Sequence, residues 1–68
     1  MAAEAYYYIG MARWKQNRID DAMTAFAKGA GQRRAPHARP CREHLETLYK
    51  STHNDSLAGI EEFMSRAK

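Results

Sequence analysis

Residues 6–26 carry most of the information about how this chain folds, and they read YYYIGMARWKQNRIDDAMTAF. The first half contains no helix breaker except Gly10, which a helix accepts at a cost of about 1 kcal/mol relative to alanine. Asn17 then supplies a suitable N-cap for a second element, and we predict helices over residues 3–16 and 18–30. The second helix is marked by apolar residues at steps of three and four, as on one helix face: Ile19, Ala22, Met23, Phe26 and Ala30.

The tyrosines at positions 6, 7 and 8 cannot all face one core. Neighbouring residues on a helix lie about 100° apart, so consecutive rings spread over more than half of the circumference. At least one tyrosine must therefore point toward another surface.

Residues 31–40, GQRRAPHARP, form the predicted connection between two halves of the molecule, because they contain both prolines. Pro40 is tolerated in the first turn of a helix but would break its interior. A third helix is therefore expected to begin near Ala38 and to span residues 38–51.

Residues 52–56, THNDS, interrupt the helical pattern a second time. Asn54 or Asp55 is expected to cap a fourth helix over residues 55–67. The sequence AGIEEFMSRA in this helix resembles DAMTAFAKGA in the second helix, so the helical hairpin occurs twice. We predict an all-α fold of two antiparallel helical hairpins, stacked through the second and third helices.

The length of the chain predicts a single small domain, and its cysteine content predicts a reducing compartment. The chain has 68 residues, and a core of that size supplies only about 3–5 kcal/mol of net stability. Cys41 is the only cysteine, which is typical of the cytoplasm, and no signal peptide or membrane span is expected. Alanine, methionine, leucine and charged residues dominate over valine and isoleucine, which favours helices.

The first hairpin, residues 1–34, resembles a tetratricopeptide repeat (TPR). The matching positions are the first aromatic, the Leu-Gly pair, the alanine and the later phenylalanine of that family, represented here by Tyr6, Ile9, Gly10, Ala22 and Phe26. The family proline comes late, at Pro36, and Arg13 stands where a second aromatic is usual. Residues 35–68 are a degenerate second copy, in which Thr47 replaces the glycine and Gly59 the alanine.

The resemblance implies TPR-like superhelical stacking and a scaffold that binds another protein or peptide without catalysis or cofactor. In this family the first helix of each hairpin lines the binding groove. The positions that correspond here are Glu4, Tyr7, Met11, Trp14 and Lys15. Tyr6 is then expected in the hairpin core, with Ile9, Met23 and Phe26, and Tyr8 toward the neighbouring hairpin.

Two other interpretations of this groove face remain open. The stripe of Tyr7, Met11 and Trp14 can instead be covered by the third helix of the same chain. Some family members grip a terminal carboxylate with lysine and asparagine, but Tyr7 and Met11 occupy those places here. An extended or helical ligand held by apolar and aromatic contacts therefore fits better.

Positive charge is concentrated in the connection between the hairpins, although the net charge of the chain is only +3. Phosphate groups are bound by such clusters, so weak binding of nucleic acid or another polyanion is the alternative function. The residues concerned are Arg33, Arg34, Arg39 and Arg42.

Metal and nucleophile chemistry receive little support from the sequence. His37, Cys41 and His44 are spaced as one helical stripe of metal ligands, but Pro40 places His37 before the helix and no fourth ligand is evident. A Cys–His nucleophile lacks an orienting partner and an oxyanion hole. We therefore expect no metal site and no enzyme activity.

The fourth helix indicates self-association. It carries Leu57, Ile60, Phe63 and Met64 along much of its surface, so apolar area is expected to face solvent in a monomer. A homodimer, formed end to end or by hairpin exchange, would cover that area.

Overall fold

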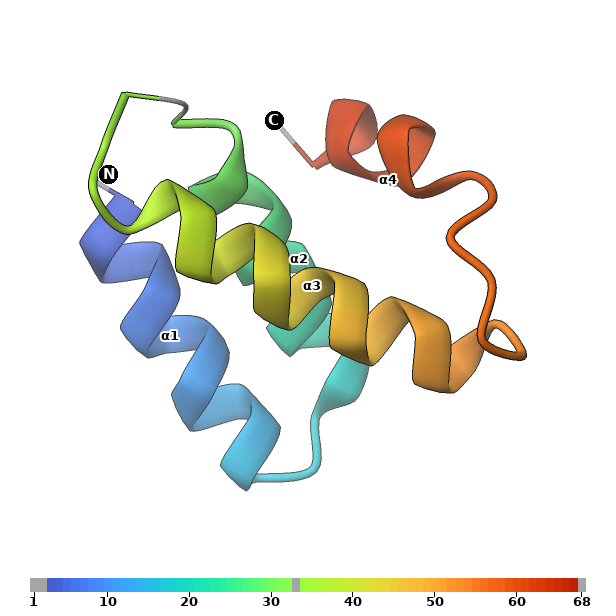
Figure 1. The fold of residues 1–68 in the computed structure, drawn as a ribbon. Helices are drawn as coiled ribbons and strands as arrows, with labels where there is room; N and C mark the ends of the chain where they lie inside the picture. Colours follow the sequence, from blue (N-terminus) through green and yellow to red (C-terminus); the bar gives the residue numbers. More distant parts are fainter. Residues whose placement is uncertain (1–2, 33, 68) are drawn as a thin grey trace.

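The computed structural model describes residues 3–32 and 34–67, and in these residues the chain forms four helices and no strand (Figure 1). The helices are α1 (Ala3–Lys15), α2 (Ile19–Ala30), α3 (Ala38–Thr52) and α4 (Ile60–Arg66). The predicted all-α class is confirmed, and α1, α2 and α3 have bounds within one residue of those predicted. None of the helices in the described residues has the length and hydrophobicity needed to cross a membrane.

Gly10 allows α1 to lie close against α2. A methyl group at Gly10 would be 2.6 Å from the ring of Phe26, so the ring occupies the space that a side chain would fill. Phe26 and Ala22 are both fully buried. Gly10 and Ala22 therefore leave room for a close approach of the two helices.

The turn between α1 and α2 is closed by the backbone. Asn17 adopts a left-handed conformation with φ 61°, which asparagine tolerates better than most residues, and the N–H of Arg18 donates to the carbonyl of Arg13 at 2.9 Å. The N-cap position of α2 is Arg18, whose side chain makes no capping hydrogen bond. The predicted N-cap role of Asn17 is therefore wrong, because the residue ends α1 instead.

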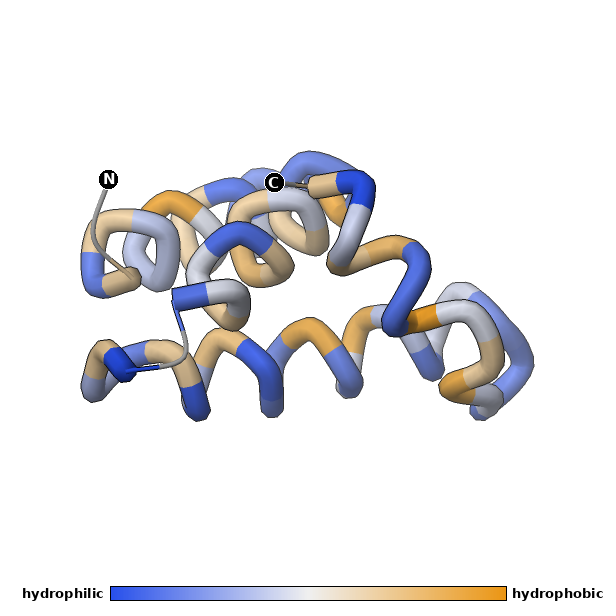
Figure 2. Tube along the Cα trace, turned by 90° about the horizontal axis from the view of Figure 1, so that it is seen from above, coloured by the Kyte–Doolittle hydropathy of each residue, from blue (hydrophilic) through white to orange (hydrophobic). Residues whose placement is uncertain are grey.

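α3 lies across α1 and α2 and turns one apolar side toward them. In Figure 2, α3 is the long lower helix, with hydrophobic positions facing the other helices and hydrophilic positions facing away. Pro40 lies in the first turn, as predicted. The buried side chains that α3 adds to the core are Ala38, Cys41, Leu45, Leu48 and Tyr49.

The start of α4 differs from the prediction by five residues, since the helix begins at Ile60 and not at residue 55. Asn54 and Asp55 both have positive φ, 54° and 66°, and the N–H of Asp55 donates to the carbonyl of Lys50 at 2.8 Å. These residues therefore terminate α3 and do not cap α4. The N-cap of α4 is Gly59, whose φ of 88° suits glycine.

α4 returns over α2 and keeps its apolar side against the core. Ile60 is buried, and Phe63 and Met64 pack partly buried against the core cluster. The prediction that some apolar area of the fourth helix faces solvent is therefore correct only for the half-buried Leu57, Phe63 and Met64, and wrong for Ile60. Gly59 precedes α4, so it does not occupy the place of the family alanine inside a helix, as the repeat pattern predicted.

Candidate functional site

The tyrosines of α1 take three different environments. Tyr7 is half-buried, with its ring centroid 6.3 Å from that of Phe26 in α2. Tyr6 is also half-buried but lines a shallow depression on the outer side of the α1–α2 pair together with Ile9. Tyr8 is 59% exposed and leans on Tyr7. The predicted core position of Tyr6 is only partly correct, and Ile9, 36% exposed, lies at the rim and not in the seam.

The predicted groove face is divided by α3. His44 of α3 stacks on Tyr7, with ring centroids 5.5 Å apart, and meets Trp14 at 5.6 Å. The third helix thus covers one side of the stripe, which was the alternative interpretation of the sequence. The other side remains open and forms a depression lined by Met11, Trp14 and Lys15.

Glu4 and Lys15, the charged members of the predicted groove, are both exposed. Glu4 lies in the first turn of α1 and Lys15 in the last, so each has the sign that suits its end of the helix dipole. All five predicted groove residues therefore lie on α1, with three half-buried apolar side chains between two exposed charges.

Trp14 is held by rings from two other helices. The ring of Phe26 in α2 packs edge to face against Trp14 with the centroids 6.3 Å apart. The ring of His44 in α3 does the same with the centroids 5.6 Å apart. His44 is also 5.3 Å from Phe26, so the rings form one cluster. From the sequence, His44 was considered as a metal ligand and as the partner of Cys41 in a Cys–His nucleophile. Its place three residues after buried Cys41 and one residue before buried Leu45 indicates that His44 faces the other helices.

The stripe of His37, Cys41 and His44 is split in the structure. The Cys41 thiol is fully buried and donates to the carbonyl of Ala3 at 3.8 Å, whereas both imidazoles lie against Tyr7. Within residues 3–32 and 34–67, no cluster of three or more His, Cys, Asp or Glu side chains is placed to hold a metal. Burial raises the pKa of Cys41 to about 11, so the thiol is protonated at neutral pH and is a poor nucleophile.

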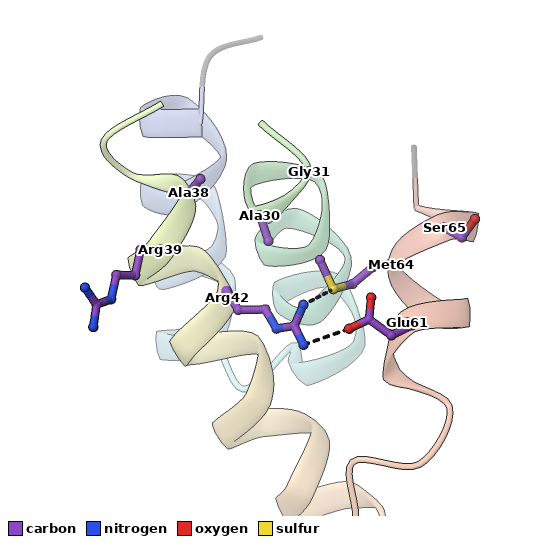
Figure 3. Close-up of a pocket in the computed structure, with 8 residues that line it drawn as sticks. All are labelled: Ala30, Gly31, Ala38, Arg39, Arg42, Glu61, Met64 and Ser65. Atoms are coloured by element: carbon purple, nitrogen blue, oxygen red, sulfur yellow. Dashed lines mark hydrogen bonds and ion pairs between the residues drawn. The ribbon is translucent and has the colours of Figure 1, made fainter. Parts of the chain in front are cut away.

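Two of the arginines of the connection, Arg39 and Arg42, are paired with carboxylates. Arg42 binds Glu46 at 3.0 Å and Glu61 at 2.9 Å, and hydrogen bonds to these carboxylates raise its pKa further. Arg39 pairs with Glu43 and extends away from the other side chains (Figure 3). Arg34 is exposed, and Arg33 lies outside the described residues.

A larger pocket of about 670 Å³ lies between the C-terminal end of α2, the start of α3 and α4 (Figure 3). Arg42 spans it, with one terminal nitrogen 3.3 Å from the sulfur of Met64 and the other on Glu61. The guanidinium and the carboxylate neutralise each other across the pocket. The polar side chains of this pocket therefore bind each other and hold α3 against α4.

Comparison with known proteins gives no relative: no family model, no curated protein and no solved structure matches this chain.

Proposed function

We propose that this chain is a protein-interaction module without catalytic chemistry, which binds an extended or helical segment of another protein on the open side of α1. The observation that carries the proposal is the depression lined by Met11, Trp14 and Lys15. Trp14 is half-exposed there, and tryptophan is among the commonest anchors of protein interfaces.

The rigid setting of Trp14 supports this role. Because Phe26 and His44 hold the indole from behind, little side-chain entropy is lost when a ligand packs on its exposed edge. Lys15 adds a positive charge at the rim, which favours a ligand with an acidic residue beside its apolar anchor. The tetratricopeptide resemblance of residues 1–34 supports the same face, since that family binds proteins through its first helices.

A random peptide library, displayed on phage and selected at moderate salt, tests the proposal. Trp14 is the only tryptophan, so a peptide that binds this face should change its fluorescence. We expect the selected peptides to share apolar or aromatic residues, to shift the Trp14 emission and to lose binding to the Met11→Glu variant.

The matched control is Thr47→Glu, which places the same charge on the exposed side of α3 and should leave peptide binding unchanged. Circular dichroism of both variants verifies that the helices persist. Peptides that bind Met11→Glu and wild type equally would contradict the proposal. Selection of acidic peptides alone, together with retention on heparin that is lost at moderate salt, would favour the polyanion alternative.

A further inference from the structure

α1 carries a second apolar stripe, most of which is exposed to solvent. Its residues are spaced at i, i+3, i+4 and i+7, the pattern of one helix face; they are Ala5, Tyr8, Ile9 and Ala12. Among the described residues, Tyr8 and Ile9 are the large hydrophobic side chains that are exposed, at 59% and 36%. α1 lies at one edge of the molecule (Figure 1).

The stripe is complementary to itself in the antiparallel direction. Ala5 and Ala12 stand three positions before Tyr8 and three positions after Ile9. A two-fold axis at the Tyr8–Ile9 peptide would therefore place Tyr8 against Ile9 of a second copy and Ala5 against its Ala12. The alanines at both ends leave room for the helices to reach the usual interaxial distance of about 8–10 Å.

The charges beside the stripe select the antiparallel arrangement. Glu4 and Lys15 are both exposed and are eleven residues apart, which is close to three whole turns, so they lie along the same side of α1. An antiparallel pair brings Glu4 of each copy toward Lys15 of the other, at both ends. A two-fold parallel pair would put this side of α1 on opposite flanks of the interface in the two copies, so the opposite charges would not meet.

From these relationships we infer that the solvent face of α1 is a homodimer interface, in which α1 packs antiparallel against α1 of a second copy about a two-fold axis. Such an interface is isologous, since the same residues contribute from both sides. It differs from the end-to-end and hairpin-exchange dimers considered from the sequence, because α4 takes no part in it. The depression of Met11 and Trp14 lies beside this interface, and Lys15, which also lines the depression, stands at the boundary of the two surfaces.

Sedimentation equilibrium over a concentration series tests the interface. We expect wild type to move from the monomer mass of 7.8 kDa toward twice that mass, and Ala12→Glu to weaken the dimer by more than about tenfold. Thr47→Glu, which adds the same charge on exposed α3, should have little effect. A wild type that stays monomeric at all concentrations, or a dimer that Ala12→Glu leaves intact, would overturn the inference.

A charge exchange tests the direction of the helices. Glu4→Lys and Lys15→Glu each place like charges at both ends of the antiparallel pair, so each variant alone should dimerise more weakly, by about fivefold. Mixed in equal amounts, the two variants should form a heterodimer more stable than either homodimer, because every end then has opposite charges. A mixture that dimerises no better than its components would overturn the antiparallel arrangement.

Discussion

The sulfur of Cys41 packs directly on the backbone of Gly29, where α3 crosses α2. A side chain at position 29 would overlap this sulfur, and the thiol also reaches the carbonyl of Ala3 at 3.8 Å. Three helices therefore meet at one buried cysteine. The missing side chain of Gly29 is what allows α3 to approach α2.

Substitution of Gly29 by alanine should destabilise the fold, by about 1–3 kcal/mol, because overpacking of a closed core outweighs the better helix propensity of alanine. Gly31→Ala is the matched control. The nearest atom to its added methyl group is 3.4 Å away and its φ is −69°, so this change should be neutral or slightly stabilising. Urea denaturation of both variants measures the difference. Equal stability of the two would contradict the close contact of Cys41 with Gly29.

Cys41 should make the fold less stable at alkaline pH. Burial raises the pKa of the folded thiol to about 11 from the ordinary value of 9.0, so the stabilising contribution is complete below pH 9.0 and is lost as the pH rises through about 11. In that window the unfolded chain has released the proton while the folded chain retains it, which costs about 1.4 kcal/mol per pH unit.

Tyrosines and lysines titrate in the same range, so the measurement is the difference between wild type and Cys41→Ala in urea denaturation at several pH values. The free energy of unfolding should fall more steeply with pH in wild type. Parallel pH profiles would show that the thiol does not retain its proton.

The fold followed from the sequence wherever local rules decide it. Gly10, Pro40 and the spacing of Ala22 and Phe26 predicted the α1–α2 hairpin and the start of α3 correctly, because each acts through its own helix or the next one. Asn54 and Asp55 were misplaced because the same residue types favour both the N-cap of one helix and the left-handed end of the one before. The carbonyl of Lys50, which accepts from Asp55, decides between the two roles.

The candidate site was less predictable because it depends on contacts between distant segments. The arginines near residue 40 suggested a cationic patch, but Arg42 is neutralised by Glu61, which is 19 residues away in the chain. In the same way, the cover over Trp14 comes from His44, and no spacing rule links these two residues. The groove residues themselves remain a prediction from the resemblance.

Tyr49 should control how firmly the segment before α4 is held. Its hydroxyl donates to the carbonyl of Ala58 at 2.7 Å, and its ring is buried against Phe63, with centroids 6.0 Å apart. Tyr49→Phe keeps the ring and removes the hydrogen bond, so we expect a loss of about 1 kcal/mol and faster proteolysis within residues 53–59. Tyr8→Phe, at an exposed ring, is the control and should change neither property. Unchanged proteolysis in Tyr49→Phe would show that the ring alone fixes this segment.

Removal of His44 should expose the tryptophan that the proposed binding face depends on. The imidazole lies within 5.6 Å of the centroids of Trp14, Tyr7 and Phe26, so His44→Ala takes away the part of α3 that covers the indole. We expect the emission of Trp14 to shift to longer wavelength and its quenching by iodide or acrylamide to increase, with a loss of stability of about 1–2 kcal/mol.

His53→Ala is the matched control, because this histidine also stacks on a tyrosine, Tyr49, with the ring centroids 3.8 Å apart, and no ring contact connects it with Trp14 among the described residues. Fluorescence that changes equally in the two variants would mean a general loosening of the fold and would contradict the specific cover of Trp14 by His44.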